Sequence, residues 1–351
     1  MNTEVIFSQN AAADLEALVR RAAVPFDKVF VLTDETTHRL CRPLLAASVI
    51  LGQAADIVVG ATDTNKNLTT LADVWKALSE GGASRRSLLV CLGGGMVTDL
   101  GGFAASTFKR GIAFVNVPTT LLSMVDAAVG GKTGINFNGL KNEIGAFSDS
   151  LAVVVDTAFL RTLDGMNLRS GYAEMLKHAL LSDDAMWAAH LRYDLSAPDY
   201  ARLQEMVAES IAVKERIVAA DPHERGLRKS LNLGHTAGHA LESLALAERR
   251  PVLHGYAVAW GMVCELYLST ALAGFPESKL RQTAAYIREH YGTFSFDCHH
   301  YEQLYAFMLH DKKNAGGAVN FSLLADVGQV RLDSHATKEQ IFEAFDFLRE
   351  G

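Results

Sequence analysis

The first 160 residues alternate short apolar runs with segments of helical spacing, and this alternation limits the possible folds more than any other feature. Most of the runs are continuously apolar, which is typical of parallel strands covered on both faces. The predicted strands are Val29–Leu32, Ile57–Val59, Ser87–Leu92, Ala113–Val117 and Leu151–Val155. Helical spacing occupies Ala11–Ala22, Leu68–Glu80 and Met96–Phe108. The pattern predicts a doubly wound, Rossmann-like α/β domain.

The pattern changes after about residue 159, where apolar residues recur every three or four positions. This spacing predicts a mainly α-helical second domain. Its predicted helices are Arg169–Leu181, Tyr200–Val218, Leu231–Leu244, Gly255–Leu272, Glu277–Tyr291 and Tyr301–Leu309. A chain of 351 residues is too long for one ordinary core. We therefore expect an α/β domain at residues 1–158 and a helical domain at residues 159–351.

Composition and charge exclude several classes of protein. The chain is 49% hydrophobic and 21% charged, and its formal net charge of -7 comes without any basic block. These values are typical of a soluble globular protein and argue against nucleic acid as a partner. Any bound anion must be held by local lysines and arginines.

We also expect a cytoplasmic protein with no membrane segment. The start of the chain lacks the cationic and apolar regions of a signal peptide. The longest apolar stretch, Ala257–Phe275, contains Glu265 and reads as a buried helix. The cysteines Cys41, Cys91, Cys264 and Cys298 are widely separated, which suits free thiols in a reducing compartment.

A glycine turn follows the strand that ends near Leu92, in the sequence GGGMVTD from Gly93 to Asp99. Consecutive glycines let the backbone approach a ligand, and the next helix offers N–H groups to a phosphate. The alternative is an ordinary tight turn, since the glycine spacing is not the Rossmann fingerprint. Asp34, at the end of an earlier strand, is well placed for a ribose hydroxyl. Asp99 is placed to orient the turn or to contact a nicotinamide.

A second polar segment runs from Ser123 to Asn142 and contains Asp126, Lys132 and Lys141 among glycines. Glycines beside a lysine suit a mobile anion-binding loop, because the ammonium supplies charge and the backbone supplies donors. The alternative is a surface loop with solvated lysines. We favour the anion-binding loop, with Lys132 at its centre.

The third segment determines the class of chemistry. His235 and His239 stand at positions i and i+4 of a predicted helix, and His254 begins the next one. Upstream, Glu174 lies three residues before Lys177. Two histidines with a carboxylate are typical of a catalytic divalent-metal site, zinc by ligand type. A packed core histidine is the alternative, and the sequence is not the HExxH protease motif.

Basic residues lie close to this segment in the sequence, namely Lys214, Arg228 and Lys229, together with the carboxylate of Glu224. The run Asp311-Lys312-Lys313-Asn314 follows farther on. Such charges usually form a solvated face. Their occurrence beside a metal-type cluster indicates a site for a polyanionic substrate instead.

Six separated segments together resemble the 3-dehydroquinate synthase family of the sugar phosphate cyclases, and the matches run from about residue 29 to residue 328. The segments are GGGMVTDLGGF, DAAVGGKTGIN, GLKNEIGAF, GYAEMLKHALL, DPHERGLRKSLNLGHTAGHALE and LHGYAVAWGM. The resemblance implies a homodimeric enzyme with an NAD-binding domain and a metal-binding helical domain. The metal is implied to be Zn²⁺ or Co²⁺. One departure from the family pattern, which has a carboxylate-rich stretch here in many members, is Asp63-Thr64-Asn65-Lys66 on the adenine side of the cofactor.

The resemblance also implies roles for individual residues. The implied metal ligands are Glu174, His235 and His254. The implied catalytic residues are His239, Glu224 and Lys132. The implied substrate contacts are Arg110, Asp126, Lys132, Asn142, Lys177, Lys214, Arg228, Asn232 and one of Lys312 or Lys313. The implied NAD contacts are Asp34, Lys66, Gly94, Gly95, Asp99, Thr119, Thr120, Lys141 and Thr162.

The implied reaction belongs to the shikimate pathway of aromatic amino acid biosynthesis. It converts 3-deoxy-D-arabino-heptulosonate 7-phosphate to 3-dehydroquinate and phosphate by transient oxidation, elimination, re-reduction and aldol closure. Three alternatives remain: an iron- or zinc-dependent alcohol or polyol dehydrogenase, another sugar phosphate cyclase, and a non-enzymatic dinucleotide sensor. Lys132, Lys177 and Arg228 have no evident purpose in a dehydrogenase. A sensor needs neither a metal nor an acid/base histidine.

Overall fold

The computed structural model describes residues 3–138, 140–309 and 319–350, and they form two compact units. The first contains residues 1–164 and 199–211, and the second contains residues 165–198 and 212–351. The division near residue 164 is close to the predicted one, but the chain also returns to the first unit at residues 199–211. Each unit is described separately.

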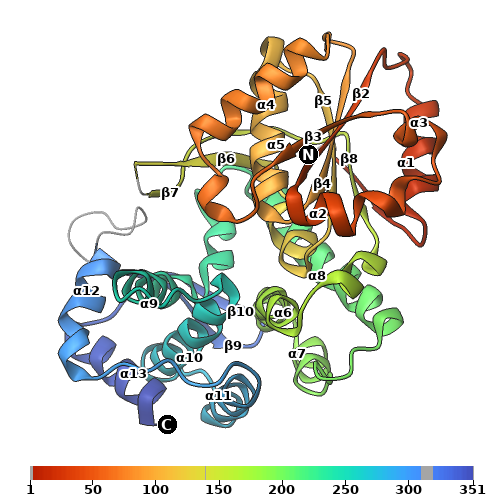
Figure 1. Ribbon diagram of the computed structural model, residues 1–351. Helices are drawn as coiled ribbons and strands as arrows, with labels where there is room; N and C mark the ends of the chain where they lie inside the picture. Colours follow the sequence, from red (N-terminus) through yellow and green to blue (C-terminus); the bar gives the residue numbers. More distant parts are fainter. Residues whose placement is uncertain (1–2, 139, 310–318, 351) are drawn as a thin grey trace. The chain divides into compact units, whose positions relative to one another are not determined.

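A six-stranded parallel sheet forms the centre of the first unit, in the order β1-β8-β5-β4-β2-β3 (Figure 1). The strands are β1 (Glu4–Phe7), β2 (Val29–Asp34), β3 (Ala55–Val59), β4 (Leu88–Gly93), β5 (Ala113–Pro118) and β8 (Ala152–Val155). The strand order reverses between β2 and β4. In sheets of this kind, ligands bind at the carboxyl ends of the strands near such a reversal.

Helices cover both faces of this sheet (Figure 1). The helices are α1 (Ala11–Arg20), α2 (Glu35–Leu40), α3 (Val49–Gly52), α4 (Leu68–Glu80) and α5 (Gly95–Thr107). Leu71, Val74 and Leu78 of α4 join Val97 and Leu100 of α5 in one apolar core with the strands β2, β3 and β4. The fully buried strand β4 explains why its sequence is continuously apolar.

The segment predicted as a loop around Lys132 is instead an antiparallel hairpin of β6 (Lys132–Phe137) and β7 (Leu140–Phe147). It follows a short π-helical segment at Ser123–Ala127. The prediction of a loop was therefore wrong. No strand signal is visible in the sequence here because β7 is exposed along most of its length, and no apolar face is buried to create an alternating pattern.

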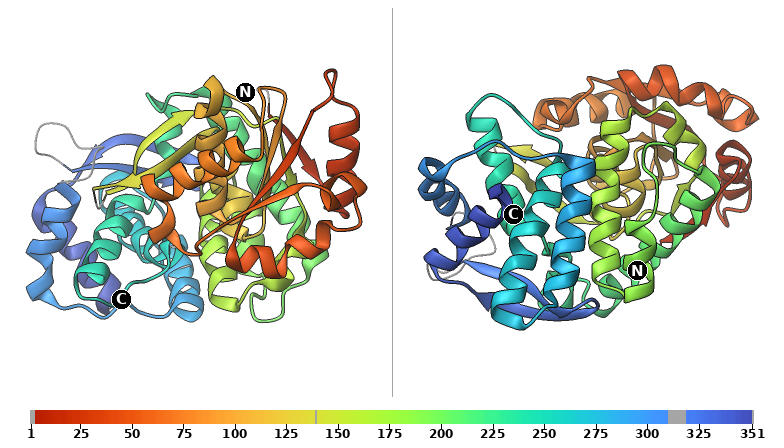
Figure 2. Two further views of the ribbon diagram at one scale, coloured as in Figure 1. Left: turned by 45° about the horizontal axis from the view of Figure 1, so that its top comes forward. Right: turned by 90° about the horizontal axis from the view of Figure 1, so that it is seen from below.

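The second unit is mainly α-helical, as predicted (Figures 1 and 2). Its helices are α6 (Gly165–Leu180), α7 (Asp184–Leu191), α9 (His235–Ala247), α10 (His254–Ala273), α11 (Glu277–Tyr291), α12 (Tyr301–Leu309) and α13 (Lys338–Glu350), and α8 (Tyr200–Ala220) lies partly in each unit. An antiparallel hairpin of β9 (Asn320–Asp326) and β10 (Gln329–His335), absent from the predictions, completes the unit.

Shorter 3-10 turns occur in both units, at Arg42–Leu45, Asp63–Asn65, Phe108–Arg110, Thr157–Thr162, Leu227–Asn232 and Cys298–His300.

Helix α10 lies at the centre of the second unit and packs against α6, α9, α11 and α13. Two glycines allow the closest of these approaches. A Cβ on Gly255 would lie 1.8 Å from the Ser170 carbonyl oxygen of α6, and one on Gly261 would lie 2.0 Å from the Gly234 carbonyl oxygen before α9. The three helix backbones therefore touch, which brings the ligand-type residues that they carry within reach of one another.

Helix α10 is also the one described helix that is long and apolar enough to cross a membrane, by length and composition. Of its most apolar 18-residue window, 67% is buried inside the protein. The buried residues run from Gly255 to Ser269. The prediction of a buried helix is therefore confirmed.

Candidate functional site

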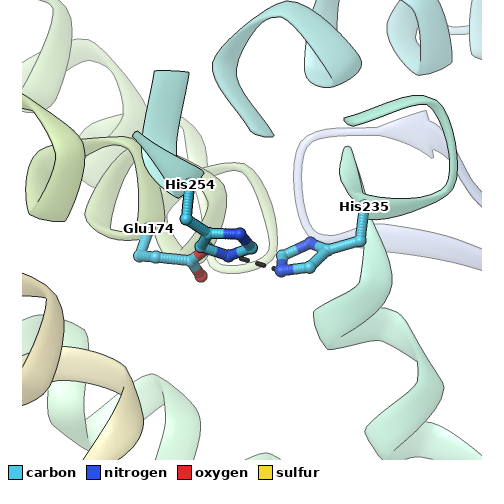
Figure 3. A group of neighbouring side chains, drawn as sticks. All are labelled: Glu174, His235 and His254. Atoms are coloured by element: carbon cyan, nitrogen blue, oxygen red, sulfur yellow. Dashed lines mark ion pairs between the residues drawn. The ribbon is translucent and has the colours of Figure 1, made fainter. Parts of the chain in front are cut away.

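Glu174, His235 and His254 come from three helices of the second unit, and their side chains point toward one another (Figure 3). Glu174 Oε1 lies 3.4 Å from Nε2 of His235 and 3.6 Å from Nε2 of His254. Each residue offers one ligand atom, and these atoms lie within 4.8 Å of one another. The structure thus brings together the three residues predicted as metal ligands.

The donor set fits a divalent cation. Glu174 is fully buried, and its Oε1 accepts no hydrogen bond from the described residues. Buried carboxylate oxygens rarely lack a partner, so this atom needs an explanation. His235 Nδ1 lies 3.1 Å from the Leu233 carbonyl oxygen, which can only accept, so this nitrogen carries the proton and Nε2 has a lone pair. A carboxylate and an imidazole lone pair facing one point are what Zn²⁺ or Co²⁺ requires.

Two further residues, His239 and Glu242, surround His254. The His239 ring centroid lies 5.3 Å from that of His235 and 5.9 Å from that of His254. Glu242 was not among the predicted site residues, and its Oε2 lies 3.6 Å from Nδ1 of His254. The two nitrogens of His254 therefore face two different carboxylates. The i, i+3 spacing of His239 and Glu242 on one helix was the available sequence signal.

The polar residues before α9 form a second group in the same unit. Asn232 Nδ2 donates to Glu224 Oε1 at 3.0 Å, so these two predicted residues are in contact. Arg228 is 2% exposed and donates through a guanidinium nitrogen to the Pro222 carbonyl at 2.8 Å. Glu224 adopts a left-handed backbone conformation with φ 57°. Such a conformation in a non-glycine residue is uncommon and is enriched at functional sites.

Two more predicted lysines of the second unit, Lys177 and Lys214, are buried. Lys177 donates to Glu174 Oε2. Buried lysines are rare unless paired, and Lys177 has its pair in Glu174. The predicted residue Lys312 and its neighbour Lys313 lie outside the described residues.

In the first unit, the predicted cofactor residues Asp34, Thr119 and Thr162 lie around Cys41, near the carboxyl ends of β2 and β5. The Cys41 thiol lies 3.7 Å from the Thr162 hydroxyl. Burial raises the pKa of this thiol, hydrogen bonds from Thr162 and Thr119 lower it, and the charge of Asp34 raises it. Asp34 Oδ1 also caps α2 by accepting from the N–H groups of Thr36 and Thr37, both at 2.8 Å. Cys41 itself was not predicted, since nothing in its neighbouring sequence marks it.

The glycine turn lies at the same edge of the sheet. Gly94 is the N-cap residue of α5 and Gly95 is its first residue, so no side chain of the cap covers the helix start. Thr119 continues from β5, and its N–H donates to the Gly93 carbonyl at 2.9 Å. Thr120 packs against Gly94. A glycine turn at an uncapped helix start fits the pyrophosphate of a dinucleotide.

A further cluster in the first unit is centred on Lys66, which is only 5% exposed. Its ammonium contacts Asp99 Oδ2 at 2.8 Å and also donates to the side chain of Asn142. Burial raises the pKa of Asp99, Lys66 lowers it, and the charge of Asp126 raises it. Lys66, Asp99, Asp126 and Asn142 are therefore neighbours, and Lys66 contacts the residue assigned to the nicotinamide half.

Asn136, which was not predicted, ties this cluster together. Its Oδ1 accepts from the Asn142 N–H at 2.9 Å, and its Nδ2 donates to Asp63 Oδ2 at 2.9 Å. Its own N–H donates to the Lys66 carbonyl at 2.8 Å. Asn142 has a left-handed backbone with φ 51° that these contacts hold in place. Lys132 and Lys141 lie on the two strands of the same hairpin.

The structure does not bring Arg110 to the glycine turn or to the cluster around Lys66. It lies in the turn Phe108–Arg110 at the far end of α5, which has 13 residues and is therefore about 20 Å long. It lines a shallow hollow with Ser84, Arg85, Thr107 and Lys109.

Comparisons with known proteins agree with the resemblance drawn from the sequence. The family models described as 3-dehydroquinate synthase N-terminal and C-terminal match residues 56–170 and 171–314. A 3-dehydroquinate synthase of Parabacteroides distasonis is 52% identical over 348 residues, covering 99% of this chain and 98% of that protein. One from Leptospira interrogans is 37% identical over 319 residues, covering 90% and 87%.

Among solved structures, 2-epi-5-epi-valiolone synthase from Streptomyces hygroscopicus, with NAD⁺ and Zn²⁺ bound, has a TM-score of 0.84 at 26% identity. The match covers 100% of this chain and 97% of that one. The predicted fold, an α/β domain followed by a helical domain, is confirmed. The family predicted from the six segments is confirmed as well, and the chain belongs to the 3-dehydroquinate synthase family.

Proposed function

We propose that this protein catalyses the 3-dehydroquinate synthase reaction, a phosphate-eliminating carbon–oxygen lyase step of the shikimate pathway. Its substrate is 3-deoxy-D-arabino-heptulosonate 7-phosphate, and its products are 3-dehydroquinate and phosphate. Two observations carry the proposal: a relative with that function is 52% identical over 99% of the chain, and the Glu174–His235–His254 group, whose carboxylate is fully buried, fits a catalytic metal.

Glu174, His235 and His254 would hold the metal, Zn²⁺ or Co²⁺, with a coordination position left for the substrate. The glycine turn at Gly94 and Gly95 would hold the NAD pyrophosphate at the start of α5. When bound, the metal supplies a Lewis acid for substrate oxygens, and NAD accepts a hydride and returns it. The other proposed NAD contacts are Asp34, Lys66, Asp99, Thr119, Thr120, Lys141 and Thr162.

The substrate carries a carboxylate and a phosphate, while the protein has a formal net charge of -7. Binding therefore depends on individual cations. Charge-assisted contacts of this kind contribute roughly 1.5–3 kcal/mol each. We propose Lys132, Lys177, Lys214 and Arg228 as these cations, with Asp126, Asn142 and Asn232 orienting the hydroxyl groups. Arg110 and Lys312 remain predictions.

Proton transfers need groups within reach of the reacting atoms. His239 lies one helical turn after His235 and beside His254, so it is the proposed acid/base residue. Glu224, held by Asn232, is the second candidate. His239 and Glu224 can both transfer protons without coordinating the metal.

Phosphate release from the seven-carbon acid phosphate, measured with and without a chelator, tests the proposal. We expect release that stops on chelation, many turnovers per bound NAD, and no steady NADH absorbance. Stoichiometric NADH formation on a polyol would select the dehydrogenase alternative. Preference for a sugar phosphate that lacks the carboxylate would select another cyclase of the superfamily.

We also propose that the protein acts as a homodimer in the cytoplasm. The family resemblance supports the dimer, and the four widely separated free cysteines support a reducing compartment. Analytical ultracentrifugation of the purified chain tests the first proposal, and fractionation of the producing cells tests the second.

A further inference from the structure

Glu265 is a fully buried carboxylate in the middle of α10, the most apolar helix of the second unit. None of the roles proposed so far involves it. Placing an ionised carboxylate in a protein core is costly unless hydrogen bonds compensate it. Its presence among Cys264, Leu266 and other buried residues therefore needs a reason.

The contacts of Glu265 supply that reason. Its Oε2 accepts from the backbone N–H of Gly234 at 2.6 Å, and its Oε1 accepts from that of Ala237 at 3.1 Å. Gly234 is the N-cap of α9 and Ala237 is the third residue of that helix. The carboxylate of one helix thus binds two N–H groups at the start of another.

Helix α9 cannot provide this cap itself. Its N-cap position is a glycine with φ 79°, a left-handed conformation that disfavours other residues. A Cβ at this position would also lie 2.5 Å from Met262 Cγ. The usual serine, threonine or aspartate cap is therefore excluded, and the first N–H groups of α9 need an acceptor from elsewhere.

The capped turn is the one that orients His235. His235 is the first residue of α9, and its Nδ1 donates to the carbonyl of Leu233, one residue before the cap. His239 follows one turn later on the same helix. Fixing the N–H groups of Gly234 and Ala237 thus fixes the backbone that supports both the imidazole and the carbonyl that sets its tautomer.

We propose that Glu265 is a positioning residue that holds the start of α9 and thereby directs Nε2 of His235 toward Glu174 and His254. The proposal rests on the proposed function only in taking His235 as a metal ligand. A negative charge at a helix start is also favourable toward the helix dipole. The protein thus uses one buried charge to set the geometry of a site that Glu265 does not enter.

The test compares Glu265→Gln with Leu266→Ala, a substitution of the neighbouring buried residue on the same helix. Gln keeps the shape but replaces one acceptor oxygen by an NH₂ group. In metal-free protein, we expect amide exchange of residues 234–237 to accelerate at least about tenfold in Glu265→Gln, because a cap hydrogen bond is lost. Leu266→Ala should lower the midpoint of unfolding without this local effect.

The second readout is zinc affinity by competition with a chelator, which should fall about 10- to 100-fold in Glu265→Gln and stay near wild type in Leu266→Ala. If Glu265→Gln does not fold, Glu265→Asp replaces it, since the shorter carboxylate keeps the charge but loses reach. Equal loss of affinity in both variants, or unchanged exchange and affinity in the Glu265 variant, overturns the proposal. Because exchange is measured without metal or substrate, this failure differs from a failure of the synthase assay.

Discussion

Lys177 donates a hydrogen bond to Glu174 Oε2, so one oxygen of this buried carboxylate is bound to an ammonium while the other faces His235 and His254. Burial raises the pKa of Glu174, but Lys177 and His254 outweigh it and hold the pKa well below the usual range. The carboxylate is therefore ionised at any working pH. A metal ion can therefore bind Oε1 of Glu174 without displacing a proton from it.

Removing the metal should abolish turnover and leave the fold largely intact. The three proposed ligands lie on α6, α9 and α10, which pack through extensive buried surfaces of their own. Dialysis against a chelator, followed by far-UV circular dichroism and a phosphate-release assay, checks this. Retained activity, or a lost helical signal, contradicts it. Added Zn²⁺ or Co²⁺ should restore turnover.

Replacing Lys177 by Met should destabilise the metal-free protein by about 3–5 kcal/mol, because the substitution leaves Glu174 as a buried charge without its cation. Denaturant unfolding of metal-free protein measures the change. Lys76→Met, at an exposed position on α4, is the control and should stay within about 0.5 kcal/mol of wild type. A Lys177 variant as stable as this control would show that the ion pair is not needed for folding.

Glu242→Gln should weaken zinc binding about 10- to 100-fold, because a carboxylate beside the second nitrogen of a ligating histidine fixes the tautomer and orientation of the ring. Competition with a chromogenic chelator measures this affinity. Glu248→Gln, which removes a surface carboxylate that pairs with Arg250 just after the same helix, is the matched control. Affinities within twofold of each other in the two variants would exclude an orienting role for Glu242.

Lys132→Met should lower kcat/KM at least about a hundredfold, since losing a charge-assisted contact to a phosphate costs on the order of 3 kcal/mol. Metal content and NAD affinity should change little, because the lysine is assigned to neither. The residue lies exposed at the start of β6. Lys76→Met again serves as the control for loss of a surface charge. Near-normal kinetics in Lys132→Met would indicate that this residue is a solvated surface lysine with no role in substrate binding.

One of the four thiols should react quickly with a disulfide reagent in the native protein. Cys298 is exposed, whereas Cys41, Cys91 and Cys264 are buried free thiols. Burial raises the pKa of Cys91 and Cys264, which keeps them protonated and slow to react. Stopped-flow absorbance of the native and unfolded protein counts the fast and total thiols. More than one fast thiol in the native protein would contradict the buried positions.

The sequence predicted the parallel sheet and most long helices because their burial leaves a strong apolar pattern. The strand β4 and the helix α11 show this, since the first is continuously apolar and the second has helical spacing. The hairpin β6–β7 was missed for the opposite reason, because β7 is exposed along most of its length and has no buried face. The second hairpin was missed although it carries a local signal: β9 has four consecutive buried residues, and β10 alternates between exposed and partly buried positions.

In the site, too, residues close together in the sequence could be grouped by prediction, whereas contacts between distant residues could not. The i, i+4 pair His235 and His239 is visible in the sequence, because one helix face creates it. Glu174 lies 61 positions before His235, so residue type suggested the grouping, and the resemblance to a known family assigned these residues as ligands. Glu265 and Asn136 act through backbone N–H and carbonyl groups of distant residues, and such contacts leave no residue pattern to read.

Helix α8 passes from one unit to the other, with its residues 200–211 in the first and its residues 212–220 in the second. The chain therefore changes unit three times, after residues 164, 198 and 211. A gene truncated after codon 164 would encode the parallel sheet without part of its own helical cover. Exchange of whole units with another cyclase would likewise need three junctions, one of them inside a helix. Recombination during evolution faces the same obstacle, which favours inheritance of the two units together.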